Sequence, residues 1–377
     1  MGGGVHTKSY GALLDGLNKA TGVKVDEQVM NINDLYSKLA MGASVGQVPD
    51  CALLLTPAIP HFATIGVIDP IDPAVLTQNG IKEADYPKSV WDGETYQGKH
   101  YAVTQDLVRD ILYLNDKMFQ DAGLTDSNGK PKAPTNKEEL IATAQKLTKN
   151  GAYGFAVGGG ASYPAFETFF WQNDANFFSA DLSKSALADP AAIEVGDFWG
   201  SLATQLKIAP PDGVDQVKGF VAGKVGMVLD GTWDANGFVD AKVAFTVAQV
   251  PQVFKKPLVW SIGHEFTFPK QKTPSDAKVA GVWKLIRWMT DNGATWTLEG
   301  GVLAVNQKTL QDPRVANDPV LKVFLAGTDN WRGGQSTPKW TDAEAKVEPI
   351  MDAIYTGKQS AKDGLALAAK QLDALSG

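Results

Sequence analysis

Apolar residues along the chain follow two patterns that predict alternating helices and strands. An apolar residue at every third or fourth position predicts amphipathic helices. Such runs cover residues 9–22, 34–47, 136–151 and 279–292. Short runs of β-branched and other apolar residues predict buried strands. These runs cover residues 23–30, 51–55, 107–115, 225–229 and 242–251. The alternation of the two patterns predicts an α/β protein with largely parallel sheets.

The helical patterns also predict which side chains face the core. In the second helix the spacing places Leu35, Leu39 and Met41 inward. Gly22 is expected to end the helix before it, because glycine adopts the positive φ of a helix terminus at little cost. A later helix carries one apolar stripe, made of Val282, Leu285, Ile286 and Met289.

Length and charge limit the classes of protein that fit. With 377 residues, two domains are expected, because single cores stop growing at roughly 250 to 300 residues. The formal net charge of −7 disfavours binding to nucleic acid, whose phosphates would be repelled. The sequence has no apolar run of membrane-spanning length and no recognisable signal peptide. The expectation is therefore a cytosolic protein or a mature or trimmed exported one.

Motifs for catalysis are weak. The run from Gly42 to Gly46 has the spacing of a hydrolase nucleophile elbow, but a helix is predicted before Ser44 and a strand after it, the reverse of the required order. The four histidines are scattered, so no metal site and no cofactor is expected. A glycosidase pair of carboxylates stays open as an alternative. Its candidate members are Glu167, Asp174, Asp230 and Glu265.

Tryptophan is the residue type that points to a ligand. Several of the ten tryptophans lie in predicted turns beside polar residues. These are Trp233, Trp260, Trp331 and Trp340. Trp233 follows a predicted buried strand, where α/β sheets bind ligands. Aromatic faces suit the apolar faces of sugar rings, and neighbouring charged groups suit the hydroxyls. The other interpretation of Trp233 is core packing.

Four segments of the chain carry recognisable motifs, namely residues 47–54, 98–124, 220–234 and 282–307. Together they resemble bacterial extracellular solute-binding proteins of family 1, the sugar-binding components of ABC importers. The third of them is similar to the family's Phe-x-x-Gly-Lys…Met…Gly-x-Trp segment, and the fourth to its late Trp-Lys-Phe-Ile-x-Trp region. The resemblance runs nearly from end to end. Two departures are a missing first strand and Thr104-Gln105 where the family often has proline.

The resemblance implies a two-lobed periplasmic-binding-protein-like fold of type II with a ligand cleft between the lobes. Lobe 1 would comprise residues 1–106 and 264–308, without the usual first strand. Lobe 2 would comprise residues 107–263 and 309–377. Three hinge crossings are expected near residues 106–109, 259–263 and 305–310.

The same resemblance suggests a set of ligand-binding residues. Trp233 is the main platform, followed by Tyr163 and by Trp171 and Gln172, for which helix packing is the alternative. Residues near the crossings and at the start of the chain complete the set, with Trp331 and Arg332 included mainly on composition. These are Asp106, Arg109, Trp260, His264, Glu265, Thr56, Gly4, His6 and Lys8.

The function expected is that of a substrate-binding component of an ABC importer, a monomer that binds a mono- or oligosaccharide and closes around it without catalysis. The partners would be the sugar and the permease subunits, with no nucleic acid. The location would be periplasmic or extracellular and lipid-anchored. Three alternatives stay open, namely a receptor for a phosphorylated or anionic solute such as a glycerol phosphate, a carbohydrate-active enzyme, and an engineered scaffold derived from a binding protein.

Overall fold

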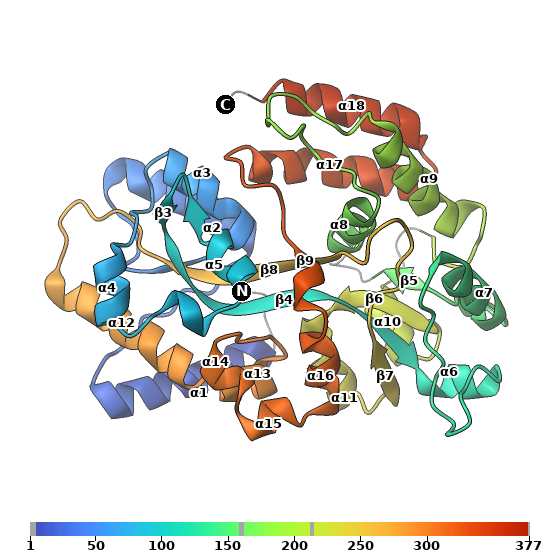
Figure 1. Cartoon of the computed structure of the whole chain (residues 1–377), viewed down its shortest axis with the longest axis horizontal. Coiled ribbons are helices and arrows are strands. Elements are labelled where there is room, and N and C mark those ends of the chain that lie inside the picture. The colour runs from blue at the N-terminus through green and yellow to red at the C-terminus, as the bar shows by residue number, and fades with distance from the viewer. Residues whose placement is uncertain (1–4, 158–161, 212–214, 376–377) are drawn as a thin grey trace. The chain divides into compact units, whose positions relative to one another are not determined.

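The computed structural model of the chain describes residues 5–157, 162–211 and 215–375, without the side chains of residues 5–8 and 162. The chain divides into two compact units. Unit 1 consists of Met1–Val108, Ile262–Lys322 and Ser336–Pro338. Unit 2 consists of Arg109–Ser261, Val323–Gln335 and Lys339–Gly377. The boundaries at 108/109 and 261/262 fall inside the strands β4 and β8 (Figure 1).

Unit 1 contains two short sheets and several helices. Its helices are α1 (Val5–Thr21), α2 (Ile32–Val45), α3 (Ile59–Thr64), α4 (Pro73–Gln78), α5 (Lys88–Gly93), α12 (Asp276–Asp291), α13 (Gly293–Gly300), α14 (Gln307–Leu310) and α15 (Pro313–Ala316). Its strands are β1 (Ala52–Leu55), β2 (Thr95–Tyr96), β3 (Lys99–His100) and parts of β4 (Ala102–Asn115) and β8 (Val259–Thr267). β1 pairs with β8 antiparallel, so that Leu55 lies opposite His264.

Two groups of packed helices and strands form the interior of unit 1. The helix α1 packs against α12 and α13 (Figure 1), and buries Tyr10, Leu13 and Leu17. β1 and the helix that follows it form a second cluster, with Leu54, Ile59 and Phe62 almost completely buried. The ends of α2 are set by Asn31, which accepts a hydrogen bond from the backbone of Asp34, and by Gly46 at φ 71°.

Unit 2 is built on a larger sheet covered by helices. Its helices are α6 (Asp116–Asp121), α7 (Lys137–Leu147), α8 (Ser162–Gln172), α9 (Pro190–Thr204), α10 (Gln216–Val221), α11 (Ala235–Asp240), part of α16 (Pro319–Leu325), α17 (Trp340–Tyr355) and α18 (Ala361–Asp373). The strands besides β4 and β8 are β5 (Ala156–Val157), β6 (Met227–Gly231), β7 (Phe245–Ala248) and β9 (Trp331–Arg332).

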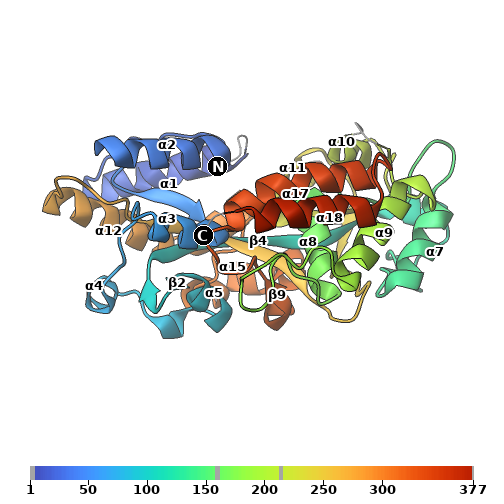
Figure 2. The same cartoon turned by 90° about the horizontal axis from the view of Figure 1, so that it is seen from above.

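Within unit 2, β4 pairs antiparallel with both β6 and β7. β5 runs parallel to β6, and the start of β8 runs parallel to β9. The helices α9, α17 and α18 pack on one another, as Figure 2 shows for α17 and α18. This arrangement buries Trp199, Trp340 and Leu365 in one continuous core.

Several predicted features of the elements are confirmed. Gly22 takes a φ of 73° directly after α1, and the stripe on α12 is buried as expected. The predicted strands at 51–55, 107–115, 225–229 and 242–251 correspond to β1, β4, β6 and β7.

Three predictions about the elements are wrong. Residues 23–30 form no strand, because an alternating apolar and polar pattern does not by itself provide a neighbouring strand to pair with. Val25 and Val29 in this segment are 37% and 45% exposed. Met41 is 63% exposed, since it lies about 200° around the helix from Leu39, which is buried. In the described part of the chain, most strand pairs are antiparallel rather than parallel. The succession of helices and strands along the sequence does not determine strand direction, because the chain passes from one unit to the other inside β4 and β8.

The units differ from the predicted lobes mainly in the late part of the chain. The chain leaves unit 1 at 322/323 rather than near 305–310, because α14 and α15 pack against α13. It also returns briefly to unit 1 at Ser336–Pro338. The ligand-binding lobes as such stay a prediction.

Candidate functional site

Asp106 is the centre of a hydrogen-bonded cluster in unit 1. Its side chain is 1% exposed. Oδ1 lies 2.6 Å from Nδ1 of His264, and Oδ2 accepts hydrogen bonds from Trp296 Nε1 at 2.7 Å and Gln105 Nε2 at 3.0 Å. The hydroxyl of Tyr10 adds a further hydrogen bond to this cluster by donating to Gln105 Oε1 at 3.2 Å. The structure thus brings together the predicted Asp106 and His264, and adds residues that the sequence analysis missed.

His264 is the part of this cluster that stays accessible, with 27% of its side chain exposed. Burial acts to lower its pKa, but the charge of Asp106 and the hydrogen bond to it act in the opposite direction, so that the pKa is raised overall. The imidazole is therefore held in a fixed orientation and keeps its proton to higher pH than a free histidine does.

A second cluster in unit 1 contains Thr56 and Glu265, both predicted, together with Glu94. Thr56 Oγ1 donates to Glu265 Oε1 at 2.6 Å and accepts from the backbone N–H of Gly263 at 2.8 Å. Glu94 accepts a hydrogen bond from Thr104 Oγ1 and lies 3.2 Å from Nε2 of His100.

Both carboxyl groups of this second cluster are 1% exposed. Burial raises the pKa of Glu94 to about 8. Burial, followed by the charge of Glu94, raises the pKa of Glu265 well above its usual range. Near neutral pH the pair therefore retains protons, and Glu265 positions Thr56 by accepting the hydrogen bond from its hydroxyl.

In unit 2 the predicted Trp233 lies at the end of β6. It belongs to a short 3₁₀ turn, η3 (Thr232–Asp234), which leads into α11. The indole lies directly against Gly231, where a Cβ would come within 1.9 Å of its ring. The ring of Trp260 meets it edge-on at 6.2 Å. Trp233 remains half-buried, so part of its surface is accessible.

Buried carboxyl groups run beside this turn. Asp110 on β4 accepts a hydrogen bond from Thr168 Oγ1 at 2.6 Å, and Thr168 accepts one from the backbone of Trp260 at 2.9 Å. The neighbouring Glu167 lies 3.5 Å from the hydroxyl of the predicted Tyr163, which is half-buried. Burial raises the pKa of Asp110 to about 7, so this buried carboxyl group is partly protonated near neutral pH.

Arg109 is engaged with main-chain carbonyl groups of its own unit. Its Nη1 donates to the carbonyl oxygens of Phe324 at 2.9 Å and Ala326 at 2.8 Å, and its Nη2 donates to Gln249 Oε1 at 2.9 Å. The guanidinium lies 5.3 Å from the ring centre of Trp331. The side chain of Arg109 is 1% exposed, so it acts as a support of the 324–331 segment in this structure.

The predicted residues Trp171, Gln172 and Arg332 form a packed group. Trp171 is completely buried against Phe177 and Trp340. The guanidinium of Arg332 lies 4.5 Å from its ring centre and donates to Asn176 at 2.6 Å. Helix packing, the alternative interpretation, therefore accounts for Trp171.

Gln172 serves a similar structural purpose. Its amide donates to the carbonyl oxygens of Pro251 at 3.0 Å and Leu258 at 3.2 Å, and it accepts from the backbone of Val253 at 2.7 Å. The side chain is completely buried. Gln172 thus ties α8 to the 251–258 loop.

Three predicted residues cannot be placed. Gly4 lies outside the described residues, as do the side chains of His6 and Lys8. Among the residues that are described, no group of three or more His, Cys, Asp or Glu side chains could hold a metal ion. Over the same residues, no helix has both the length and the apolar character of a membrane span.

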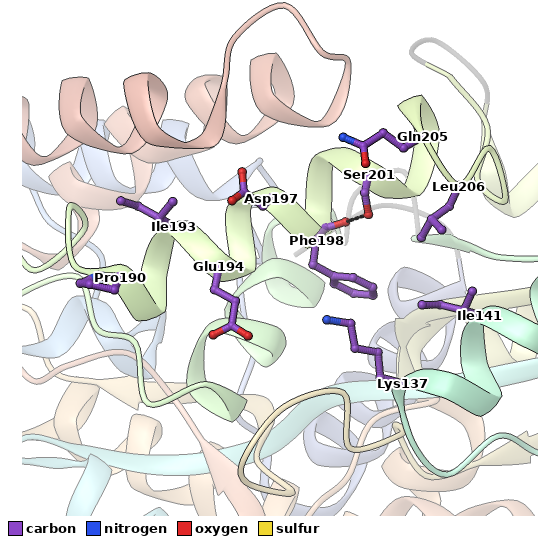
Figure 3. Close-up of a pocket in the computed structure, with 10 residues that line it drawn as sticks. All are labelled: Lys137, Ile141, Pro190, Ile193, Glu194, Asp197, Phe198, Ser201, Gln205 and Leu206. Carbon is purple, nitrogen blue, oxygen red and sulfur yellow. Dashed lines mark hydrogen bonds between the residues drawn. The ribbon is translucent and has the colours of Figure 1, made fainter.

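A surface cavity of about 620 Å³ lies in unit 2 between α7 and α9, away from the predicted residues. Figure 3 shows its lining, with Phe198 above Lys137 and Ile141 near Leu206. The ammonium group of Lys137 lies 4.7 Å from the ring centre of Phe198 and 4.9 Å from that of Phe254. None of the predicted ligand-binding residues lines this cavity.

Comparison with known families now identifies the chain. The model of the bacterial extracellular solute-binding protein family matches residues 3–296. The chain belongs to this family. The family consists of solute-binding proteins, as the resemblance in the sequence implied.

Curated relatives of this solute-binding protein include two that are named for maltooligosaccharides. A maltotriose-binding protein from Pyrococcus abyssi is 24% identical over 90% of the chain and 70% of its own length. A maltooligosaccharide ABC transporter solute-binding lipoprotein from Streptococcus pneumoniae is 25% identical over 62% of the chain. The match spans about half of that relative, 54% of its length.

Solved structures of solute-binding proteins share the fold. An ABC substrate-binding protein from Listeria monocytogenes, in complex with cycloalternan, gives a TM-score of 0.85 at 19% identity, covering 97% of this chain and 95% of the other. A maltose/maltodextrin-binding domain from Bdellovibrio bacteriovorus, bound to maltotriose, gives 0.81 at 20% identity, covering 98% and 96%. The predicted α/β fold of the family is therefore confirmed.

Proposed function

We propose that this solute-binding protein is the substrate-binding component of an ABC importer and that its ligand is a mono- or oligosaccharide. The observation that carries the proposal is the turn at Trp233, where a partly exposed indole lies at the end of a strand and Asp230 and Asp234 flank it in the sequence. Indole surfaces suit sugar rings, and carboxyl groups suit hydroxyls. The names of the maltooligosaccharide-binding relatives support the same ligand class.

In this proposal the sugar binds between two lobes and holds them closed. Trp233 and Tyr163 are the contacts from one side, and Thr56 and His264 those from the other. Closure is favoured only to the extent that the ligand contacts the closed form better than the open one. The protein releases the sugar unchanged to permease subunits, works as a monomer, and needs no cofactor or metal. Its location is periplasmic, or extracellular with a lipid anchor.

The two main rivals have less support. A receptor for an anionic solute would use Arg109 and Arg332, but their guanidinium groups are engaged by carbonyl groups, by amide oxygens and by indole rings. A glycosidase would use carboxylates such as Glu167 and Asp230. Nothing in the described part of the chain marks two of these carboxylates as a catalytic pair.

The direct test is calorimetric and fluorescence titration with maltotriose and a panel of other sugars. Gly231→Ala provides the matched variant, because the added Cβ would displace Trp233. We expect it to weaken sugar affinity about tenfold or more, since aromatic anchors carry much of a binding energy. Gly237→Ala on α11 is the control, because a Cβ there meets nothing within 4 Å. Absence of heat and fluorescence change with every sugar would contradict the proposal, and turnover of chromogenic glycosides would favour the enzyme.

A further inference from the structure

The hydrogen bonds around Asp106 determine which nitrogen of His264 a ligand can reach. The indole N–H of Trp296 and the amide N–H of Gln105 both donate to Oδ2 of Asp106, at 2.7 and 3.0 Å. Oδ1 is left for Nδ1 of His264, at 2.6 Å. Nε2 makes no hydrogen bond to any residue that the structure describes, and 27% of the side chain is exposed. Nε2 is therefore the ring nitrogen that remains for a ligand, and all four residues belong to unit 1.

The contact between Asp106 and His264 also fixes the position of its proton. In model peptides a carboxylic acid is a stronger acid than an imidazolium by about two to three pH units. The shared proton therefore lies on Nδ1, which donates to Oδ1 of Asp106. With Nδ1 occupied in this way, Nε2 is an acceptor when the ring is neutral and a charged donor when the ring is protonated.

The charged groups around His264 favour the protonated ring. Burial acts to lower the pKa of His264, but the charge of Asp106 and the hydrogen bond to it, together with the charge of Glu265 on β8, raise it above the usual 6.5. The amino terminus of the chain, outside the described residues, acts in the same direction as burial. Burial raises the pKa of the nearby Tyr10 well above its usual range, so this hydroxyl stays neutral. At pH 6.5 more than half of the His264 side chains are therefore imidazolium.

We propose that Asp106 is a positioning residue that presents the Nε2–H of the His264 imidazolium to an acceptor oxygen of the bound carbohydrate. This inference rests on the function proposed above and adds a charged donor to the ligand contacts of unit 1. A charge-assisted hydrogen bond is roughly twice as strong as a neutral one. Trp296 and Gln105 support the arrangement by holding the other oxygen of the carboxylate. The affinity for the sugar should then follow the protonation of His264.

The first test is the pH dependence of binding. The sugar favours the imidazolium, so its affinity is highest below the raised pKa of His264 and falls as the pH rises through that value. Above it, up to one proton passes from the solvent to Nε2 for each sugar bound. Calorimetry with maltotriose, or with the tightest-binding sugar of the panel, in pairs of buffers of different ionisation enthalpy measures both effects. We expect Kd to rise about tenfold or more between about pH 5.5 and 9.

Asp106→Asn distinguishes a positioning role from a purely structural one. Because the indole N–H of Trp296 can only donate, the amide oxygen of the variant takes the place of Oδ2 and its NH₂ group faces Nδ1 of His264. That group donates to Nδ1, so the ring stays neutral with its proton on Nε2. We expect binding about fivefold weaker than in the wild type at acidic pH, with no pH dependence and similar affinities at alkaline pH. ¹⁵N NMR of the ring should show Nδ1 protonated in the wild type and only Nε2 protonated in the variant.

Two histidine variants complete the comparison. His264→Gln removes the titrating ring, so its affinity should not change with pH, and it assigns the NMR signals of His264. His61→Gln is the matched control, because His61 also lies in unit 1 but its Nδ1 is 3.2 Å from the carbonyl oxygen of Pro338 rather than beside a carboxylate. It should keep the pH profile of the wild type.

The outcomes separate this inference from the proposed function. A wild-type affinity that does not change with pH would overturn the inference and leave a carbohydrate receptor. So would a pH dependence that survives in His264→Gln, because it would come from another group such as Glu94 or the amino terminus. An unchanged profile in Asp106→Asn would have the same meaning, and if that variant does not fold, the wild type and His264→Gln decide. Binding of no sugar in the whole panel would overturn both the inference and the proposed function.

Discussion

At the scale of single residues, the structure shows how a buried acid positions an accessible base. Asp106 is held by donors from Trp296 and Gln105, and it directs the imidazole of His264 through a 2.6 Å contact. Since Asp106 is almost completely buried, the contact is poorly screened by solvent and depends on the proton carried by His264.

This contact predicts a pH dependence of stability. Because the pKa of His264 is raised in the folded protein, the stabilisation is fully present below the pH of about 6.5 at which an unfolded histidine titrates, and it is lost as the pH rises through the raised value. We expect the melting temperature of the wild type to exceed that of His264→Gln most clearly at acidic pH, and the difference to shrink toward alkaline pH. Thermal unfolding of both proteins from about pH 5 to 9 measures it. A difference that stays constant with pH would contradict the assignment.

The sequence indicated some of the candidate site residues but not their partners. Trp233 could be singled out because it follows a strand in a glycine-containing turn. Trp296 and Glu94 could not, because their importance comes from contacts with Asp106 and Thr104, and the first of these spans 190 positions of the chain. For Trp171 the sequence could not show the distant neighbour Trp340, against which the side chain is buried.

At the scale of elements, helix ends are fixed by individual polar side chains. The helix α18 begins directly after Ser360, whose Oγ accepts a hydrogen bond from the backbone of Asp363 at 3.1 Å and donates one to its carboxylate at 2.7 Å. The helix α12 also follows a serine, Ser275, but that side chain makes no capping hydrogen bond. The two helices therefore offer a matched comparison.

We expect Ser360→Ala to lower the free energy of unfolding by about 1 kcal/mol, because the first turn of α18 loses its side-chain acceptor. Ser275→Ala should change it by only a few tenths of a kcal/mol, because no such bond exists there. Denaturant titration followed by circular dichroism compares the two variants. Equal losses in both would show that the capping bond of Ser360 contributes nothing particular.

Most helices and strands could be predicted from periodicity, but their pairing could not. The stripe on α12 and the strand β1 were recognisable because their apolar residues follow one period without interruption. The segment 23–30 has the alternation of a strand but remains exposed. A segment becomes a strand only when another strand lies beside it to pair with. This depends on the tertiary structure and cannot be read from the sequence of the segment itself.

At the scale of the whole molecule, stability and binding are linked. A ligand that binds the folded protein and not the unfolded chain stabilises it by RT ln(1 + [L]/Kd). Under the proposed function, maltotriose or the preferred sugar at a hundredfold excess over Kd should raise the free energy of unfolding by about 2.7 kcal/mol. Scanning calorimetry over a range of sugar concentrations tests this. A melting temperature that does not move with any sugar would contradict the proposal.

The path of the chain has a practical consequence for work on the separate units. Each unit is assembled from three stretches of sequence, and two of the divisions fall within β4 and β8. No single uninterrupted gene fragment therefore encodes either one. A polypeptide terminated after Ser261 would retain α1 but lack α12 and α13, the helices against which α1 packs. To produce either unit alone, its separate stretches of sequence must therefore be joined by new linkers, because simple truncation cannot yield it.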